Sequence, residues 1–321
     1  MKIEDYGLIG DLQTAALVGR DGSVDWLCLP RFDSPSCFSA LLGDEGHGRW
    51  LLAPVGEVTG TSRRYRPGTL VLETEFETAD GAVRVTDFMP RRGGRAPQLM
   101  RIVAGLRGRV PMRMELAMRP DYGSVVPWVE PVVDGVLVQS GPDAFHLSTP
   151  LELAVDRNAT TAAFAAVEGA RQHFALSWYR SYAEAPPVED ADSALARTDA
   201  FWREWSGRCS YDGDYRDEVL TSLIALKAMT EETTGAVVAA PTTSLPEDLG
   251  GVRNWDYRYC WLRDSVLTLN ALLAGGYTDE ALAFRDYVMR IATGDPASAQ
   301  IMYGVGGERR LDEFELDWLP G

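Results

Sequence analysis

The sequence contains few cysteines and few histidines. Four cysteines and three histidines occur among 321 residues, no two cysteines have the Cys-x-x-Cys spacing, and the histidines stand far apart. This scarcity disfavours a disulfide framework of the secreted type and a metal site built by the protein. We therefore expect reduced thiols in a cytoplasmic protein. Separately, the sequence suggests no organic cofactor. The cysteines are Cys28, Cys37, Cys209 and Cys260, and the histidines are His47, His146 and His173.

Long apolar runs and an excess of basic residues are also missing. No stretch approaches the length of about 18 apolar residues that crosses a membrane, and residues 1–5 begin without a basic and apolar leader. Lysine and arginine together number 31 against 47 acidic residues, which gives a net charge of −16. An acidic chain repels phosphate backbones and anionic lipid surfaces. The composition thus predicts neither a nucleic-acid nor a membrane partner, and it is compatible with a neutral ligand such as a sugar.

The N-terminal part of the sequence has the two-residue alternation of antiparallel strands. Three Asp-Gly pairs, which favour tight hairpin turns, separate extended runs at residues 21–22, 80–81 and 134–135. Residues 110–119 alternate apolar and polar side chains, as in a strand with one solvated face. Two further extended runs cover residues 145–155 and 172–178. This pattern predicts an antiparallel β-sandwich.

Helical periodicity replaces this alternation after a segment at residues 184–190 that contains two prolines and that we interpret as a linker. Residues 193–205 can form a helix, and apolar residues at helical spacing predict another over residues 215–232. Asp264 opens another helical run, which ends at two glycines, and a fourth run begins at Thr278, a residue type that caps helices. The sequence therefore predicts a sandwich followed by helices that short loops connect.

The segment at residues 254–264 combines four aromatic and four charged side chains in eleven residues. A pyranose ring has apolar C–H faces that pack on aromatic rings, and its hydroxyl groups bind carboxylate and guanidinium groups in pairs. This composition indicates a sugar-binding wall, although it also fits rings that pack in a protein core. The rings belong to Trp255, Tyr257, Tyr259 and Trp261, and the paired polar groups belong to Arg263 and Asp264.

Two parts of the sequence resemble one known family. Residues 257–265, Tyr-Arg-Tyr-Cys-Trp-Leu-Arg-Asp-Ser, resemble the Trp-x-Arg-Asp signature of family 15 glycoside hydrolases, which include glucoamylases and bacterial trehalases. Residues 3–11 and 21–33 resemble the trehalase-like N-terminal domain of the same bacterial proteins. The resemblance implies an N-terminal antiparallel β super-sandwich, followed by the opening helices of an (α/α)6 toroid.

The resemblance also implies a division of the chain and the chemistry of its active site. We expect the sandwich in residues 1–183, a linker and linker helix in residues 184–212, and an incomplete first part of the toroid in residues 213–321. Family members hydrolyse α-glucosidic bonds with inversion, using one glutamic acid to protonate the leaving oxygen and a second glutamate to activate water. Both glutamates are implied to lie beyond Gly321. We therefore expect this chain to be truncated, with little or no hydrolase activity of its own.

The same resemblance assigns roles to four residues. Arg263 and Asp264 are expected to bind hydroxyl groups of the non-reducing terminal glucose, and Tyr257 and Trp261 are expected to surround that ring. Trehalose and the ends of α-1,4-glucans or oligosaccharides all present such a glucose, and the N-terminal similarity slightly favours trehalose. Two alternatives stay open, a disaccharide phosphorylase and a noncatalytic carbohydrate-binding or interaction protein. The oligomeric state does not follow from the sequence.

Overall fold

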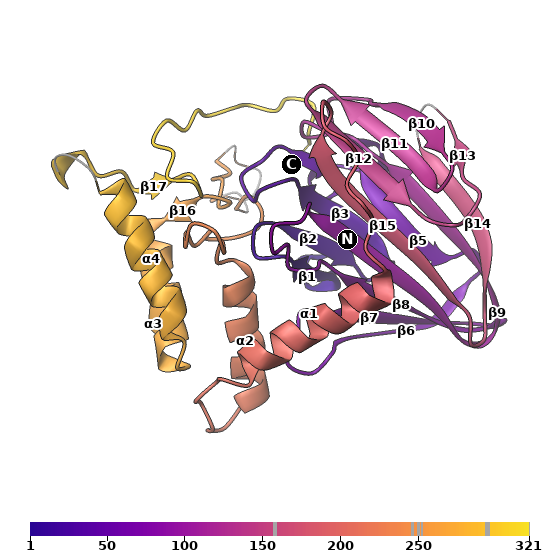
Figure 1. The fold of residues 1–321 in the computed structure, drawn as a ribbon, viewed down its shortest axis with the longest axis horizontal. Coiled ribbons are helices and arrows are strands. Elements are labelled where there is room, and N and C mark those ends of the chain that lie inside the picture. The colour runs from indigo at the N-terminus through magenta and orange to yellow at the C-terminus, as the bar shows by residue number, and fades with distance from the viewer. Residues whose placement is uncertain (157–158, 245–246, 249–250, 252, 293–295, 321) are drawn as a thin grey trace.

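The computed structural model describes residues 1–156, 159–244, 247–248, 251, 253–292 and 296–320. Figure 1 shows a body of antiparallel strands with the helices beside it. The strands of this body are β1 (Tyr6–Gly10), β2 (Ala15–Gly19), β3 (Ser23–Cys28), β4 (Ser36–Phe38), β5 (Arg49–Pro54), β6 (Val58–Tyr65), β7 (Leu72–Thr78), β8 (Gly81–Phe88), β9 (Gln98–Ala117), β10 (Trp128–Val132), β11 (Gly135–Ser140), β12 (Asp143–Ser148), β13 (Ala154–Val155), β14 (Thr160–Val167) and β15 (Arg171–Arg180). Short 3-10 helices are η1 (Ile3–Asp5), η2 (Ala40–Leu42), η3 (Glu45–His47) and η4 (Pro296–Ser298).

The strands form two layers that share the long strand β9. The first half of β9 pairs with β8 and β15, and its second half pairs with β5 and β14. The change of partners falls at Gly105 and Gly108. A Cβ on Gly105 would lie 2.1 Å from the carbonyl oxygen of Val167, and Gly108 has a φ of +69°. Glycine is therefore required where the strand passes from one layer to the other.

The structure confirms the three hairpins that the Asp-Gly pairs predict. They connect β2 to β3, β7 to β8 and β10 to β11 in antiparallel register. In the first hairpin Gly22 has a φ of +86°, and a Cβ there would lie 2.4 Å from the carbonyl oxygen of Leu52. A side chain at this position would meet both backbone strain and a fixed backbone atom.

The predicted strands are present, with differences in length. The alternating run at residues 110–119 is the second half of β9, and Val110, Met112 and Met114 of this run are buried. The run predicted over residues 145–155 is interrupted, because β12 ends at Ser148 and β13 includes only two residues. Pro150 lies in the interruption, and proline has no N–H to donate to a strand ladder.

The space between the layers is filled by apolar side chains. Trp50, Phe38 and Phe174 are among those without exposed surface. A buried ion pair lies with them: Arg101 donates to a carboxylate oxygen of Asp87 and to the carbonyl oxygens of Trp50 and Gly22, each over 2.7 Å. A buried guanidinium is tolerated when its donors are satisfied in this way.

Four α-helices lie in the described part of the chain, namely α1 (Ala191–Ser206), α2 (Arg216–Ala228), α3 (Leu262–Ala274) and α4 (Thr278–Ile291). They confirm the predicted helices with changed ends. The α2 helix stops at Ala228 rather than near Glu232, because Thr230 pairs with Val237 in an isolated bridge. Thr278 is the first residue of α4 and makes no capping bond there. In the described residues no helix has the length and apolar character to cross a membrane.

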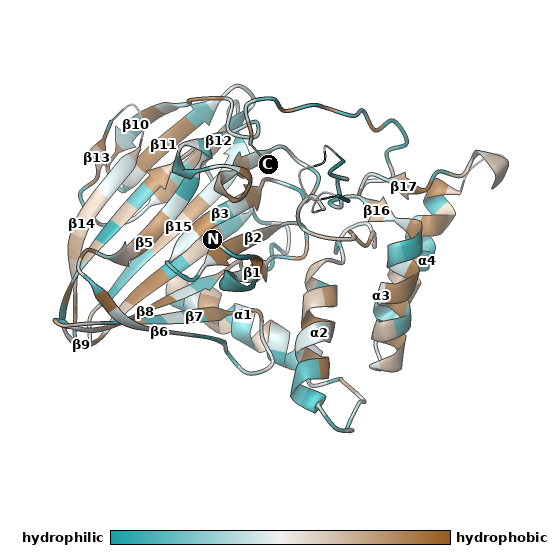
Figure 2. Ribbon diagram, turned by 180° about the vertical axis from the view of Figure 1, so that it is seen from behind, coloured by the Kyte–Doolittle hydropathy of each residue, from teal (hydrophilic) through white to brown (hydrophobic). Residues whose placement is uncertain are grey.

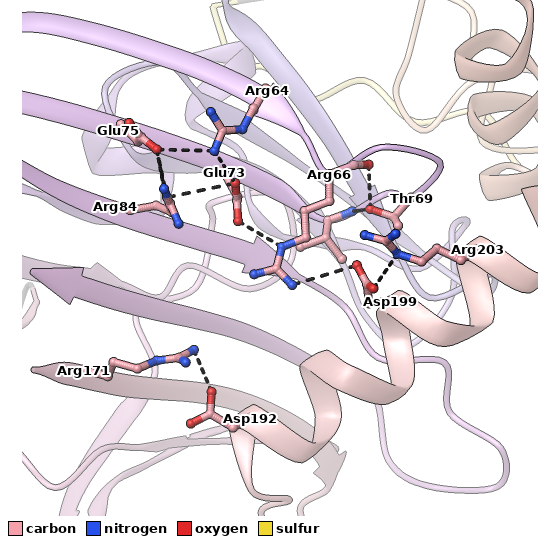
Figure 3. Close-up of polar contacts among 11 residues, drawn as sticks. Arg64, Arg66, Thr69, Glu73, Glu75, Arg84, Arg171, Asp192, Asp199 and Arg203 are labelled. Carbon is pink, nitrogen blue, oxygen red and sulfur yellow. Dashed lines mark hydrogen bonds and ion pairs between the residues drawn. The ribbon is translucent and has the colours of Figure 1, made fainter. Parts of the chain in front are cut away.

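The α1 helix packs against the outer face of the sandwich. Ala191, Ala194 and Leu195 of α1 are buried in one cluster with Val71 and Phe88. Ion pairs flank this contact, as Figure 3 shows: Arg171 lies 2.6 Å from Asp192, and Arg66 lies 3.9 Å from Asp199. Asp199 also binds Arg203 one turn later on the helix. These contacts join residues 191–206 to the sandwich.

The α3 and α4 helices carry apolar side chains that no described residue covers. Leu267 on α3 is 67% exposed and Met289 on α4 is 70% exposed, and Val266, Leu273 and Leu282 are also exposed. Figure 2 shows hydrophobic colouring along both helices. Apolar helix faces of this kind normally pack against another element.

Candidate functional site

The segment that carries the predicted site residues leads into α3 through an isolated bridge at Asp256, a bend at residues 258–259 and the short strand β16 (Cys260–Trp261). The backbone carbonyl oxygens of Trp255, Tyr257 and Tyr259 accept hydrogen bonds from the N–H groups of Ser244, Ala240 and Ala239, respectively. Further along, β16 pairs with β17 (Met302–Tyr303), and α3 begins at the next residue, Leu262. The rings therefore stand on backbone that is held on both edges.

Burial alternates along this segment with the two-residue period of a strand. Arg258 and Cys260 are buried, whereas Tyr257, Tyr259 and Trp261 are half-buried. The rings of Tyr257 and Trp261 meet edge to face, with centroids 5.6 Å apart and planes at 85°. The Nε1 of Trp261 donates to the carbonyl oxygen of Asp256 over 3.0 Å, which fixes the orientation of its indole.

Arg263 and Asp264 lie in the first turn of α3 and reach solvent. A nitrogen of Arg263 lies 3.2 Å from Oδ2 of Asp264, and the Arg263 side chain is 76% exposed. The next residue, Ser265, is buried and donates to the carbonyl oxygen of Trp261 over 2.8 Å. This first turn therefore presents a guanidinium and a carboxylate outward, as a sugar-binding pair requires. Their contact with a sugar stays a prediction.

The other two rings of the segment are placed differently. Trp255 is exposed and donates from Nε1 to Glu247 over 2.7 Å. Burial raises the pKa of Tyr259 to about 12, and the nearby carboxylate of Asp256 adds to this rise. Tyr259 is therefore a neutral phenol at any physiological pH.

Arg258 is a residue of this segment to which the sequence reasoning gave no role. Its side chain is 2% exposed, and it donates to the carbonyl oxygen of Ser34 over 2.6 Å, to the hydroxyl of Tyr122 over 2.8 Å and to Oδ2 of Asp256 over 2.7 Å. Its guanidinium carbon lies 5.8 Å from the ring centre of Trp26 and 5.3 Å from that of Tyr122. The alternation of the segment was the available signal, because it turns Arg258 away from the neighbouring rings.

A second loop reaches the same part of the sandwich. The segment after β17, residues 303–308, contacts the loop after β3: the N–H of Val305 donates to Oδ2 of Asp33 over 3.2 Å, and Arg31 binds both Asp33 and Glu308. Burial alone would raise the pKa of Glu308, but backbone hydrogen bonds and Arg31 outweigh it and hold the pKa below its ordinary value. Glu308 is therefore ionised near neutral pH, and it is a poor general acid.

A cavity of about 300 Å³ lies away from these residues, between the segment at residues 65–70 and the exposed side of α2. Its lining is mostly apolar, with Arg66 and Asp217 as its charged members. Arg66 is already bound to Glu73 over 2.9 Å. The segment at residues 254–264 does not line this cavity.

Comparison with known families agrees with this architecture. The model of the trehalase-like N-terminal family matches residues 1–192, and the model of glycosyl hydrolases family 15 matches residues 213–321. The second range contains the extended segment, the ring pair and α3. The chain therefore belongs to the family 15 glycosyl hydrolases that carry a trehalase-like N-terminal region.

Three curated trehalases are similar to the chain over nearly its whole length. The chain is 36% identical to the trehalase of Mycolicibacterium smegmatis, over 99% of the chain and 52% of that trehalase. It is 34% identical to the trehalase of Mycobacterium tuberculosis, over 99% of the chain and 51% of that trehalase. It is 32% identical to the trehalase of Thermoplasma volcanium over 99% of its length and 52% of the relative. The chain thus spans about half the length of the curated relatives it matches.

Proposed function

We propose that this chain supplies the sandwich and the terminal-glucose subsite of an inverting, exo-acting α-glucosidase that releases glucose from trehalose. The observation that carries the proposal is the geometry of residues 256–264, where a half-buried ring pair directly precedes an arginine–aspartate pair that faces solvent. The relatives described above are named trehalases, which favours trehalose over α-1,4-glucan or oligosaccharide ends.

The proposed subsite acts by stacking and by paired hydrogen bonds. The faces of Tyr257 and Trp261 pack on the C–H groups of the terminal glucose, and Arg263 with Asp264 binds two neighbouring hydroxyl groups. Rings fixed before the sugar arrives lose little conformational entropy on binding. The subsite thereby holds one glucose and leaves the bond to the second glucose accessible to the catalytic groups.

The catalytic groups of the proposed reaction are two carboxyls. Inversion requires that they stand about 6.5–9.5 Å apart, which leaves room for a water between the base and the sugar, and the acid needs a raised pKa. Among the described residues, the glutamates with shifted pKa values are Glu73, Glu280 and Glu308, and all three shift downward. These residues are thus unsuited to protonate a leaving oxygen. We propose that residues 1–321 alone release little or no glucose.

We further propose the division of the chain into the sandwich at residues 1–183, the linker with its helix at residues 184–212, and a helical catalytic part from residue 213. Two features support this division: β15, the last strand of the sandwich, ends at Arg180, and α1 lies within residues 184–212. The four cysteines are free thiols, which supports a cytoplasmic location.

The test measures glucose release from trehalose and from maltooligosaccharides, with residues 1–321 and with the longest polypeptide that the reading frame encodes. We expect release by the longer polypeptide, with inversion of the anomeric carbon, and its loss in Asp264→Ala with an unchanged circular dichroism spectrum. Unchanged kinetics of this variant would remove Asp264 from the subsite. Efficient release by residues 1–321 would show that they contain the acid and base. Release only in the presence of phosphate, as a sugar phosphate, would instead identify a phosphorylase.

A second function follows for residues 1–321 taken alone, because the ring pair and the arginine–aspartate pair are complete within them. This function is glucoside binding without turnover. Binding of trehalose in the absence of glucose release distinguishes it from hydrolysis.

A further inference from the structure

Arg258 joins the segment of the proposed subsite to three separate parts of the sandwich. Ser34 lies in the loop after β3, Trp26 and Cys28 belong to β3 itself, and Tyr122 follows β9. The guanidinium binds or stacks on each of these parts, including Sγ of Cys28 at 3.3 Å. In the other direction it binds both carboxylate oxygens of Asp256. All of its donors are thus directed either to the sandwich or back to its own segment.

The partners of Arg258 are themselves held in place. Tyr122 and its neighbour Asp121 have φ values of +57° and +54°, a left-handed conformation that is unfavourable for residues with side chains. Such strain persists only where the surroundings enforce it, and it concentrates at functional sites. The N–H of Tyr122 donates to the carbonyl oxygen of Ser36 over 3.1 Å. Trp26 is fixed by its own bond from Nε1 to the carbonyl oxygen of Pro241.

We propose that Arg258 is a positioning residue that fixes the Tyr257–Trp261 ring pair by clamping residues 256–261 to the sandwich. The inference rests on the proposed function, because it makes the sandwich a structural part of the terminal-glucose subsite. Tyr257 is next to Arg258 in the chain, and Nε1 of Trp261 donates to the carbonyl oxygen of Asp256, whose carboxylate Arg258 binds. Movement of the guanidinium therefore moves the backbone that holds both rings. Tyr122 and Ser34 are the sandwich side of the clamp.

The charge state of the clamp is fixed over the physiological range. Burial works to lower the pKa of Arg258, but its neighbours outweigh burial and keep the pKa above the ordinary value of an arginine. Burial raises the pKa of Cys28 to about 11, although Arg258 opposes the rise. A cationic guanidinium therefore faces a neutral thiol, a neutral phenol and one carboxylate. The planar guanidinium group, more than its charge, matches the positions of these partners. The ammonium group of a lysine cannot reproduce this geometry.

The test measures amide hydrogen exchange of purified residues 1–321, with and without trehalose. We expect Arg258→Lys to speed exchange at residues 253–264 by at least about tenfold, because several charge-assisted bonds are lost. We expect Tyr122→Phe, which lacks one hydrogen bond, to speed it by about fivefold. Tyr122→Phe also decides the question if Arg258→Lys does not fold. Trehalose should slow exchange at these residues in the unsubstituted chain and much less in both variants.

Arg101→Lys is the matched control, because Arg101 is also buried, lies 5.2 Å from a tryptophan ring and binds one carboxylate and two carbonyl oxygens. Its partners all belong to the sandwich, so exchange at residues 253–264 should stay unchanged. Unaltered exchange there in Tyr122→Phe and in folded Arg258→Lys would overturn the inference, as would an equal effect of Arg101→Lys. A lack of any trehalose effect on the unsubstituted chain would count against the proposed function, while the sugar-free comparison still decides the clamp.

Discussion

Arg31 donates two hydrogen bonds of 3.0 Å to a single oxygen of Glu308, although the two residues are 277 positions apart in the sequence. The first residue lies in the loop after β3, and the second follows β17. Arg31 also holds Asp33, which accepts the backbone N–H of Val305. The contact therefore joins the N-terminal sandwich to the last described part of the chain by charge.

This contact predicts a dependence of stability on pH. The folded-state pKa of Glu308 lies below its unfolded value, mainly because backbone hydrogen bonds and Arg31 outweigh the effect of burial. The stabilisation is present above the unfolded pKa, about 4.3, and is lost as the pH falls through the folded value. The difference in thermal midpoint between the unsubstituted chain and Glu308→Gln should thus shrink as the pH is lowered from 7 toward 3. A constant difference over this range would contradict the prediction.

In the first hairpin, a single added methyl group should lower the free energy of unfolding. Gly22→Ala should lower the free energy of unfolding by at least about 1 kcal/mol, because alanine disfavours a positive φ and its Cβ would meet the carbonyl oxygen of Leu52. Gly56→Ala is the control, since a Cβ there has no heavy atom within 4 Å. Urea unfolding followed by tryptophan fluorescence measures both variants, and equal midpoints would argue against this account of the turn.

Loss of a buried ion pair between the helices should lower the free energy of unfolding more than the change at Gly22. Glu280 on α4 accepts from Nε1 of Trp205 on α1 over 2.8 Å and lies 3.0 Å from Nζ of Lys227 on α2. Glu280→Ala should lower the free energy of unfolding by about 3 kcal/mol, because the ammonium and indole groups stay buried without a partner. Arg285→Ala removes an exposed pair on the same helix and should cost at most about 0.5 kcal/mol. Calorimetry of both variants tests the difference.

The ring pair predicts an effect on trehalose binding. Tyr257→Ala should weaken trehalose binding to residues 1–321 by about fivefold, the usual worth of an aromatic contact. Tyr182→Ala removes an exposed tyrosine between β15 and α1 and should have no effect. Titration calorimetry, or saturation-transfer NMR for weak binding, measures the change. Equal affinity of the two variants would exclude Tyr257 from the subsite.

The order of elements was predictable because it depends on local chemistry. The Asp-Gly turns specify hairpins through the backbone freedom of glycine, and helical spacing of apolar residues specifies α1 to α4. Less local features were not predictable. The passage of β9 between layers depends on the carbonyl oxygen of Val167 close to Gly105, and no pattern within β9 announces a neighbour more than sixty positions away.

In the site, too, features that depend on neighbouring residues were predictable, and features that depend on residues distant in the sequence were not. Composition and the resemblance selected the ring-bearing segment and Arg263, and binding by these residues stays a prediction. The role of Arg258 depends on Ser34 and Tyr122, which lie 224 and 136 positions away. Charged residues beside aromatic residues usually face solvent. The alternation of the segment separates Arg258 from the rings, and the fold adds that Arg258 is enclosed.

The shared strand β9 has a consequence for how the sandwich unfolds. Two of its neighbours lie in each layer, so both layers lose two strand pairings once this strand detaches. The body should therefore melt in a single cooperative transition, and a backbone cleavage within Gln98–Ala117 should destroy it entirely. Cleavage at the turn between β10 and β11, at the outer edge, should release only a peripheral hairpin.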